Sequence, residues 1–149
     1  MTPAERPAVG WREWIGLPDL GVEWVKAKVD TGARSSTLHA WDIEVAEIAG
    51  LVRFSVHPFQ DDDDFVVPVE APLVEMREVR SSNGDVEVRP VIRTTALIRE
   101  HPFVIELTLS RRDEMGFRML LGRSAIKRRF VVDPGRSFRG GGDNGGPPS

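Results

Sequence analysis

Short runs in which apolar and polar residues alternate recur along most of this chain. In residues 51–56 the side chains of Val52, Phe54 and Val56 alternate with more polar ones. Because successive side chains of a β-strand point to opposite faces, this pattern predicts a half-buried strand. Comparable runs predict further strands at residues 9–15, 22–29, 36–48, 65–69, 74–80, 85–95, 94–98, 103–109, 117–122 and 130–132.

A single helix is predicted, close to the C-terminus. Residues 123–129 follow a glycine and offer Ser124 as an N-cap. Many short strands, one short helix and no regular alternation of strands with helices predict a mainly β fold, a small closed or sandwiched barrel. The length of 149 residues suits one domain. We expect a flexible arm at residues 1–8, the domain at residues 9–134 and a disordered Gly/Pro-rich tail at residues 135–149.

Two turns stand out between the predicted strands. Asn83-Gly84 separates two extended runs, which is a strong sequence signal for a β-hairpin. Both arms carry many charged residues, so we expect the hairpin to project over another part of the molecule. The other turn, residues 60–64, carries four consecutive aspartates but lacks the spaced ligands and the glycine of an EF-hand loop. We interpret it as a solvated hairpin tip.

The amino-acid composition and the absence of certain motifs argue against several kinds of catalytic and metal-binding site. The chain has no cysteine, which excludes disulfides, thiol nucleophiles and cysteine-ligated zinc. Its three histidines are far apart in sequence, and it has no nucleotide-binding loop or serine-nucleophile motif, so we expect no metal and no cofactor. The net charge of −3 is uneven, because residues 42–78 hold ten acidic and two basic residues whereas residues 111–139 hold nine basic and three acidic ones. This asymmetry indicates an anionic partner, a head-to-tail contact or two solvated faces.

The stretch with the most chemical content is Asp30-Thr31-Gly32, directly after the strand predicted at residues 22–29. Taken alone, the tripeptide also suits an ordinary turn, in which aspartate caps and glycine adopts positive φ. In an active site, two such carboxylates in contact share one proton and can act on water as base and acid. The chain holds only one such motif, so a catalytic pair needs a second copy of the chain across a two-fold axis.

Three motifs along the chain, and the order in which they occur, resemble those of the retropepsin-like aspartic peptidases. They are Asp30-Thr-Gly-Ala33 after an apolar strand, Ser82-Asn-Gly84 in a hairpin, and Leu120-Leu-Gly-Arg123 before a short helix. More closely, residues 29–36, 81–84, 89–92 and 119–123 resemble a bacterial family commonly labelled ATP-dependent zinc proteases, often associated with RimK-type ATP-grasp glutamate ligases. The resemblance implies a small closed acid-protease-like (retropepsin) β-barrel with one short C-terminal helix. The sequence itself supports neither the ATP nor the zinc of that label.

The resemblance also implies a role for each motif. Asp30, Thr31 and Gly32 would form the catalytic loop, and residues 120–122 would support it from behind. The hairpin would act as a flap that closes over the substrate. The implied substrate-binding residues are Ala33, Arg34, Ser82, Asn83, Gly84 and Arg123.

The chain departs from viral retropepsins in two ways. A long acidic stretch, about residues 42–73, intervenes between the catalytic loop and the flap. In addition, Arg34 stands where those enzymes usually carry an acidic residue that pairs with the arginine after the second glycine, here Arg123. Either the two arginines face an acidic or glutamate-rich substrate, or each pairs with a local carboxylate.

The expected function is therefore hydrolysis of peptide bonds in a protein or peptide substrate by a homodimer. A non-catalytic retropepsin-like binding module and a metal-dependent hydrolase stay open as alternatives. The N-terminus has no basic segment followed by an apolar run, so we expect a cytoplasmic location, and the short apolar runs predict no membrane contact. The basic segment near the C-terminus lacks interleaved aromatic residues, so no nucleic-acid partner is expected.

Overall fold

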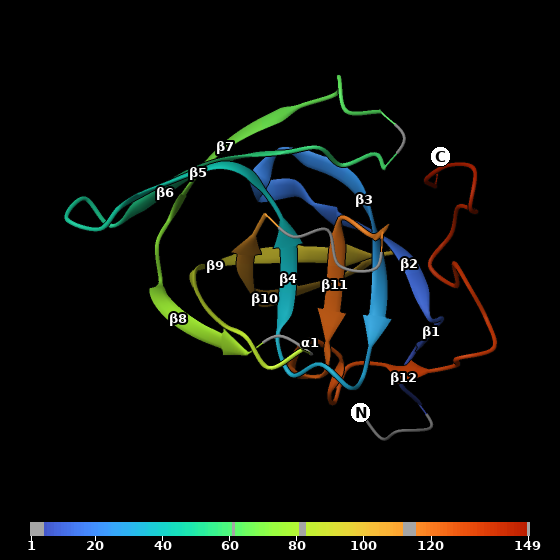
Figure 1. The fold of residues 1–149 in the computed structure, drawn as a ribbon. Coiled ribbons are helices and arrows are strands. Elements are labelled where there is room, and N and C mark those ends of the chain that lie inside the picture. Colours follow the sequence, from blue (N-terminus) through green and yellow to red (C-terminus); the bar gives the residue numbers. More distant parts are fainter. Residues whose placement is uncertain (1–4, 61, 81–82, 112–115, 149) are drawn as a thin grey trace.

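The computed structural model describes residues 5–60, 62–80, 83–111 and 116–148 (Figure 1). The strands in chain order are β1 (Ala8–Val9), β2 (Arg12–Leu17), β3 (Val22–Asp30), β4 (Ser36–His39), β5 (Trp41–Ala46), β6 (Leu51–Val56), β7 (Val67–Pro72), β8 (Glu75–Arg80), β9 (Val86–Ile98), β10 (His101–Ser110), β11 (Met119–Gly122) and β12 (Val131–Val132). A turn of 3-10 helix, η2 (Pro18–Leu20), and one α-helix, α1 (Arg123–Ile126), complete the elements of this described part. Neither is long and apolar enough to cross a lipid bilayer.

Six strands close into a barrel. Their order is β10, β4, β11, β3, β2 and β9, and β9 pairs back with β10 in antiparallel register, which completes the ring within the described residues. Closure removes the free edges of these strands. The side chains of Leu38, Ile92, Leu107 and Leu121, from four of them, are fully buried in one hydrophobic core. The predicted mainly β, closed barrel with a short helix near the C-terminus is confirmed.

The hairpin predicted around Asn83-Gly84 is formed by β8 and β9, whose last paired residues are Arg80 and Val86. Gly84 has a φ of +90°, a backbone conformation that glycine adopts without steric cost. Residues 81 and 82 lie outside the described residues. The strands predicted at residues 85–95 and 94–98 are one continuous strand, β9, which pairs with β8 along its first half and with β10 along its second.

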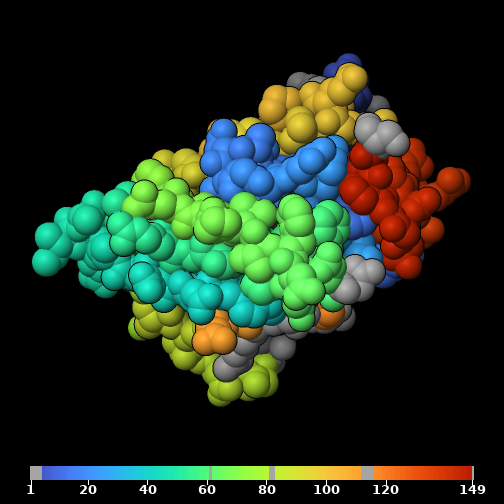
Figure 2. Space-filling model, turned by 90° about the horizontal axis from the view of Figure 1, so that it is seen from above, coloured from blue at the N-terminus to red at the C-terminus, as the bar shows by residue number. Residues whose placement is uncertain are grey.

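The strand predicted at residues 36–48 is instead divided in two. β4 pairs inside the barrel, whereas β5 leaves it and forms a separate three-stranded sheet with β6 and β7. The division falls at Ala40 and is followed by Asp42, which has a φ of +53° where the β5–β6 register shifts. Figure 2 shows the β5–β6 hairpin protruding from the body of the molecule. This sheet corresponds to the acidic stretch that sets the sequence apart from viral retropepsins.

The aspartate-rich turn at residues 60–64 is exposed at Asp62, Asp63 and Asp64, and Asp61 lies outside the described residues. Asp63 nevertheless accepts a hydrogen bond from the buried Arg118 at 2.8 Å. The guanidinium of Arg118 also lies over the ring of Trp41, 4.9 Å from its centroid. The turn therefore neutralises a buried arginine as well as facing solvent.

The helix is shorter than predicted. α1 ends at Ile126, because Lys127 leaves the helical conformation with a ψ of 128° and Arg128 follows with a φ of +68°, which a right-handed helix cannot continue. Its N-cap is Gly122 and not Ser124. The Ser124 N–H belongs to the first turn and donates to a loop carbonyl instead, at Arg34 O (3.1 Å).

Both ends of the described chain pack against the barrel. β1 pairs in parallel with β12, with Ala8 opposite Val131. The sequence predicts disorder for residues 135–149, and the structure instead places residues 136–148 beside β2. The fully buried carboxylate of Glu13 accepts hydrogen bonds from the N–H groups of Gly10, Arg139 and Gly140 at 2.6–2.9 Å. These polar partners, together with the ring of Phe138 stacked on Trp14 at a centroid distance of 6.5 Å, hold a segment whose composition predicts disorder.

Candidate active site

Asp30 is the last residue of β3, and β11 runs parallel beside it with Gly122 opposite Asp30. The Gly32 N–H donates to Asp30 Oδ1 at 2.9 Å, and the Ala33 N–H donates to Asp30 O at 3.2 Å. These two bonds fold residues 30–33 into a tight turn. The local turn geometry and a functional carboxylate are therefore compatible, because the turn fixes the orientation of the Asp30 side chain while leaving it half-buried.

Gly122 supports this loop from behind. Its N–H donates to the buried Oγ of Ser36 at 2.9 Å, and the next N–H, from Arg123, donates to Ala33 O at 2.7 Å. A Cβ at position 122 would lie 2.4 Å from Ser35 O, so only glycine lets the two backbone segments approach this closely. The contact between residues 120–122 and the segment that follows Asp30 is thus built from backbone groups and the Ser36 hydroxyl.

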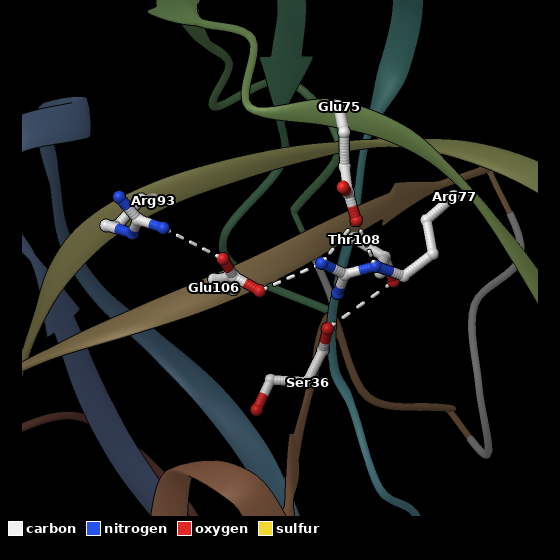
Figure 3. A network of polar contacts seen from close by, with 6 residues as sticks. All are labelled: Ser36, Glu75, Arg77, Arg93, Glu106 and Thr108. Carbon is white, nitrogen blue, oxygen red and sulfur yellow. Dashed lines mark hydrogen bonds and ion pairs between the residues drawn. The ribbon is translucent and has the colours of Figure 1, made fainter.

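The buried hydroxyl groups of Thr37 and Thr108 lie next to Ser36, and Figure 3 shows the contact between Thr108 and Ser36. Thr37 Oγ1 and Thr108 Oγ1 are 3.0 Å apart, and Thr108 Oγ1 donates to Ser36 O at 3.4 Å. Sequence reasoning did not single out these three residues. The available signal was their polarity in strands expected to be buried, since buried hydroxyl groups require partners.

A groove of about 1200 Å³ opens beside Asp30. The Asp30 loop, β4, β8, β9, β10, β11 and α1 form its walls, and β8 contributes four consecutive residues, 77–80. Among the predicted site residues, those lining the groove are Asp30, Gly32, Ala33 and Arg34. Thr31 and Arg123 are exposed and do not line the groove. Asn83 and Gly84, at the exposed hairpin tip, do not line it either, but Arg80, which does, donates a hydrogen bond to Gly84 O at 3.2 Å. Ser82 lies outside the described residues.

The groove is richer in cations than the molecule as a whole. Its lining includes three acidic residues and five arginines, namely Asp30, Glu78, Glu106, Arg34, Arg77, Arg80, Arg89 and Arg129. The entire chain, by contrast, has a net charge of −3. Apolar wall is also present at Val79, Val104 and Leu120. The groove therefore offers both a positive potential and surface that would accommodate methylene groups.

The two arginines of the resemblance do not pair with carboxylates anywhere in the described residues. Arg123 Nη1 donates to Thr31 O at 3.0 Å, which ties the start of α1 to the Asp30 loop. Arg34 is exposed at the rim of the groove. Local pairing with an acidic residue, one of the two alternatives that the sequence allowed, is therefore not seen among the residues that the structure describes.

A charged cluster links β8 and β9 to β10 (Figure 3). Glu106 accepts hydrogen bonds from Arg77 of β8 at 3.0 Å and from Arg93 of β9 at 3.1 Å. The hydrogen bond from Arg77 is the main cause that lowers the pKa of Glu106 below its ordinary value. Glu75 also pairs with Arg77. The cluster is half-exposed, so each pair contributes modestly, but together they define one wall of the groove.

Two of the three histidines meet at one tryptophan ring, and the third lies elsewhere, at the start of β10. His39 and His57 stack on Trp41, each with its ring centroid 3.9 Å from the indole centroid, and His101 begins β10. Within the described ranges, no group of three His, Asp or Glu side chains is placed to hold a metal ion.

Several known proteins resemble this chain in sequence or in structure. Its fold matches the crystal structure of a Legionella pneumophila protein of unknown function with a TM-score of 0.72 and 27% identity, covering 90% of this chain and 98% of that one. Two curated relatives are each named probable alpha-L-glutamate ligase. The Shewanella halifaxensis protein is 42% identical over 132 residues and the Parasynechococcus marenigrum protein 47% identical over 128 residues.

These matches cover 87% and 85% of this chain but only 29% and 28% of the two ligases, so the chain spans less than a third of their length. The sequence profile of the retropepsin-like aspartic endopeptidase RimB matches residues 8–140. That range contains β1 to β12, the Asp30 loop, the flap and Gly122. The chain therefore belongs to the RimB-like family of retropepsin-like aspartic endopeptidases.

Proposed function

We propose that this chain is one half of an aspartic peptidase, in which Asp30 of two copies together hydrolyses peptide bonds in acidic protein segments. The observation that carries the proposal is the placement of Asp30, whose carboxylate lies at the groove and is oriented by the Gly32 N–H at 2.9 Å. The chain has one such motif, so a second carboxylate has to come from a second copy. A two-fold axis beside the exposed Thr31 would bring the two loops together.

The chemistry follows from the electrostatics of two adjacent carboxyl groups. Like charges at contact distance cannot both ionise, so the pair holds one proton. The ionised member removes a proton from water, whose oxygen attacks the peptide carbonyl carbon, while the shared proton goes to the carbonyl oxygen. Transfer of a proton to the peptide nitrogen then lets the C–N bond break. Gly32 holds the carboxylate in position, and closure of the flap would exclude bulk water.

An acidic substrate is supported by the charge of the groove. Arg34 and Arg80 are exposed where they line it, and guanidinium groups bind carboxylates through two parallel hydrogen bonds. The apolar wall at Val104 and Leu120 would accommodate the methylene groups of glutamate. The relatives named probable alpha-L-glutamate ligase point to the same chemical class.

The test is cleavage of fluorogenic glutamate-rich peptides by wild type and by Asp30→Asn, with oligomeric state measured by analytical ultracentrifugation. Asparagine keeps the oxygen that accepts from Gly32, so the fold should persist while hydrolysis falls on the order of 10³-fold or more. A neutral peptide of equal length serves as the substrate control. Full activity of the variant, or activity confined to a strict monomer, would overturn the proposal.

A second function is favoured by one observation, the match to only 28–29% of the length of the ligases. In those proteins a region similar to this chain accompanies other sequence in one polypeptide. The chain could therefore act without catalysis, by holding an acidic product or tail for a ligase. In that case Asp30→Asn would bind acidic peptides and support ligation as well as wild type does, and no peptide cleavage would be detected for either protein.

A further inference from the structure

We propose that the exposed basic surface around α1 is an exosite, which binds the part of an acidic polypeptide that extends beyond the groove. This inference rests on the proposed function. The surface, here called the basic platform, consists of Arg34, Arg123, Lys127, Arg128 and Arg129, all of which are exposed.

Main-chain hydrogen bonds hold the platform together. The Ser124 N–H donates to Arg34 O at 3.1 Å, which joins the Asp30 loop to the first turn of α1. The Lys127 N–H donates to Arg123 O at 2.9 Å and the Phe130 N–H to Ile126 O at 3.1 Å, which fix the turn that follows. Five cationic side chains are therefore carried by two short segments whose backbones are rigidly connected.

The platform is not neutralised by the rest of the described chain. None of its five cations forms an ion pair with a carboxylate of the described residues. Arg123 and Arg129 donate to the backbone carbonyls of Thr31 and Ala125, and Arg129 also lies over the ring of Phe103. These contacts position the guanidinium groups without removing their charge. A concentration of like charge destabilises the folded protein slightly and is relieved when an anion binds.

The platform is continuous with the groove. Arg34 and Arg129 belong to both, and Ser124 and Ala125 of α1 line the groove between them. A polypeptide in the groove would pass from Asp30 onto the platform. An extended chain advances about 3.3 Å per residue, so a peptide of about four residues spans about 13 Å and one of about twelve spans about 40 Å. Only the longer peptide would reach Lys127 and Arg128, which belong to the platform but do not line the groove.

The chemistry of the platform favours a polypeptide over a nucleic acid. Single-stranded nucleic acids are usually bound by cations interleaved with exposed aromatic rings on which bases stack. The aromatic residues of this region, Phe103 and Phe130, are buried and pack on each other with their ring centroids 5.2 Å apart. An acidic polypeptide needs only the cations.

The experiment measures binding in the Asp30→Asn background, so that the peptides are not cleaved. Fluorescein-labelled glutamate peptides of about four and about twelve residues are titrated by fluorescence polarisation at low and moderate salt. The test variant is Lys127→Gln with Arg128→Asn, because asparagine tolerates the φ of +68° at position 128. Arg53→Glu on the remote β6 is the control, since it changes the net charge by the same two units.

The test variant is expected to weaken binding of the longer peptide about 3- to 10-fold, with a smaller salt dependence, and to leave the shorter peptide unchanged. The control variant should bind both peptides as the parent does. Circular dichroism checks the fold, and Lys127→Gln alone provides a second variant that leaves the left-handed turn untouched. Equal loss for both peptides, or no loss for the longer one, overturns the exosite.

Two further outcomes separate the exosite from the proposed function. If wild type does not cleave either peptide but the platform variant loses binding of the longer one, the proposed peptidase function is refuted and the exosite is supported. If wild type cleaves both peptides and the platform variant cleaves the longer one with unchanged KM, the exosite fails and the peptidase stands. Binding of an unstructured oligonucleotide more tightly than the longer peptide would assign the platform to nucleic acid and overturn the proposal.

Discussion

Replacing Gly122 with alanine tests whether the Asp30 loop depends on close backbone approach. The new Cβ would lie 2.4 Å from Ser35 O and 3.0 Å from Ala33 O. Both neighbours are backbone atoms, so no flexible side chain can move aside. Because ordinary carbon–oxygen contacts are about 3.3 Å or longer, β11 and residues 33–36 would have to separate by most of an ångström.

The expected cost has two parts. Overpacking of a close contact costs about 1–3 kcal/mol. Separation would also stretch the hydrogen bonds from Gly122 N–H to Ser36 Oγ (2.9 Å) and from Arg123 N–H to Ala33 O (2.7 Å), each with a net worth of about 0.5–1.5 kcal/mol. The variant should therefore lose about 2–6 kcal/mol of unfolding free energy in urea, with a fall in Tm of about 4–24 °C. Because the same movement displaces Asp30, cleavage measured well below Tm should also fall.

Gly146→Ala is the matched control. Its Cβ would meet nothing within 4 Å, and its φ is not positive, so stability should change by no more than about 0.5 kcal/mol. The reasoning would be refuted if Gly122→Ala were as stable as this control. It would also be refuted if Gly122→Ala lost stability but kept full activity, because the loop would then not depend on the contact.

Two further predictions concern charged groups. Glu13→Gln should lower the unfolding free energy by about 1.5–3 kcal/mol and expose residues 136–148 to proteolysis. The reason is that an amide NH₂ replaces one oxygen that accepts backbone N–H groups. A rate of proteolysis equal to that of wild type would contradict this prediction. Glu106 has a lowered pKa, chiefly through Arg77, so its contribution to stability is complete above the unfolded pKa of about 4.3 and is lost as pH falls through the lower folded pKa. Because the Glu106 side chain is 37% exposed, the Glu106→Gln variant should be less stable than wild type by at most about 1 kcal/mol at pH 7. Near pH 2 the two proteins should have the same Tm. A stability difference that does not change with pH would contradict this prediction.

The barrel could be predicted from sequence because its signals are local. Alternating apolar residues define strands, and Asn83-Gly84 defines a hairpin, each within a few positions of the chain. The contact between the Asp30 loop and Gly122 followed from the family resemblance, and the structure gives it a physical basis in steric exclusion at one glycine. The break at Ala40 was missed because β4 and β5 have a similar pattern, although they belong to different sheets.

Polar contacts between distant residues could not be predicted in this way. Thr37 and Thr108 are 71 positions apart, and Glu13 meets its partners in the C-terminal segment more than 120 positions away. Alternation alone indicates whether a residue faces the core, but it does not identify the donor that satisfies a buried carboxylate. For the same reason, the glycine-rich composition of residues 136–148 does not reveal that this segment is ordered.

The parallel pairing of the two ends of the chain has a mechanical consequence. Hydrogen bonds run from Val131 N–H to Pro7 O, from Asp133 N–H to Val9 O, from Trp11 N–H to Arg136 O and from Phe138 N–H to Arg12 O. When a force pulls the N-terminal segment toward its N-terminal end and the C-terminal segment toward its C-terminal end, all four bonds are loaded in shear at once. None of them can then open before the rest. Tension transmitted along a longer polypeptide would therefore be resisted by these four hydrogen bonds before it reached the barrel, leaving the Asp30 loop undistorted.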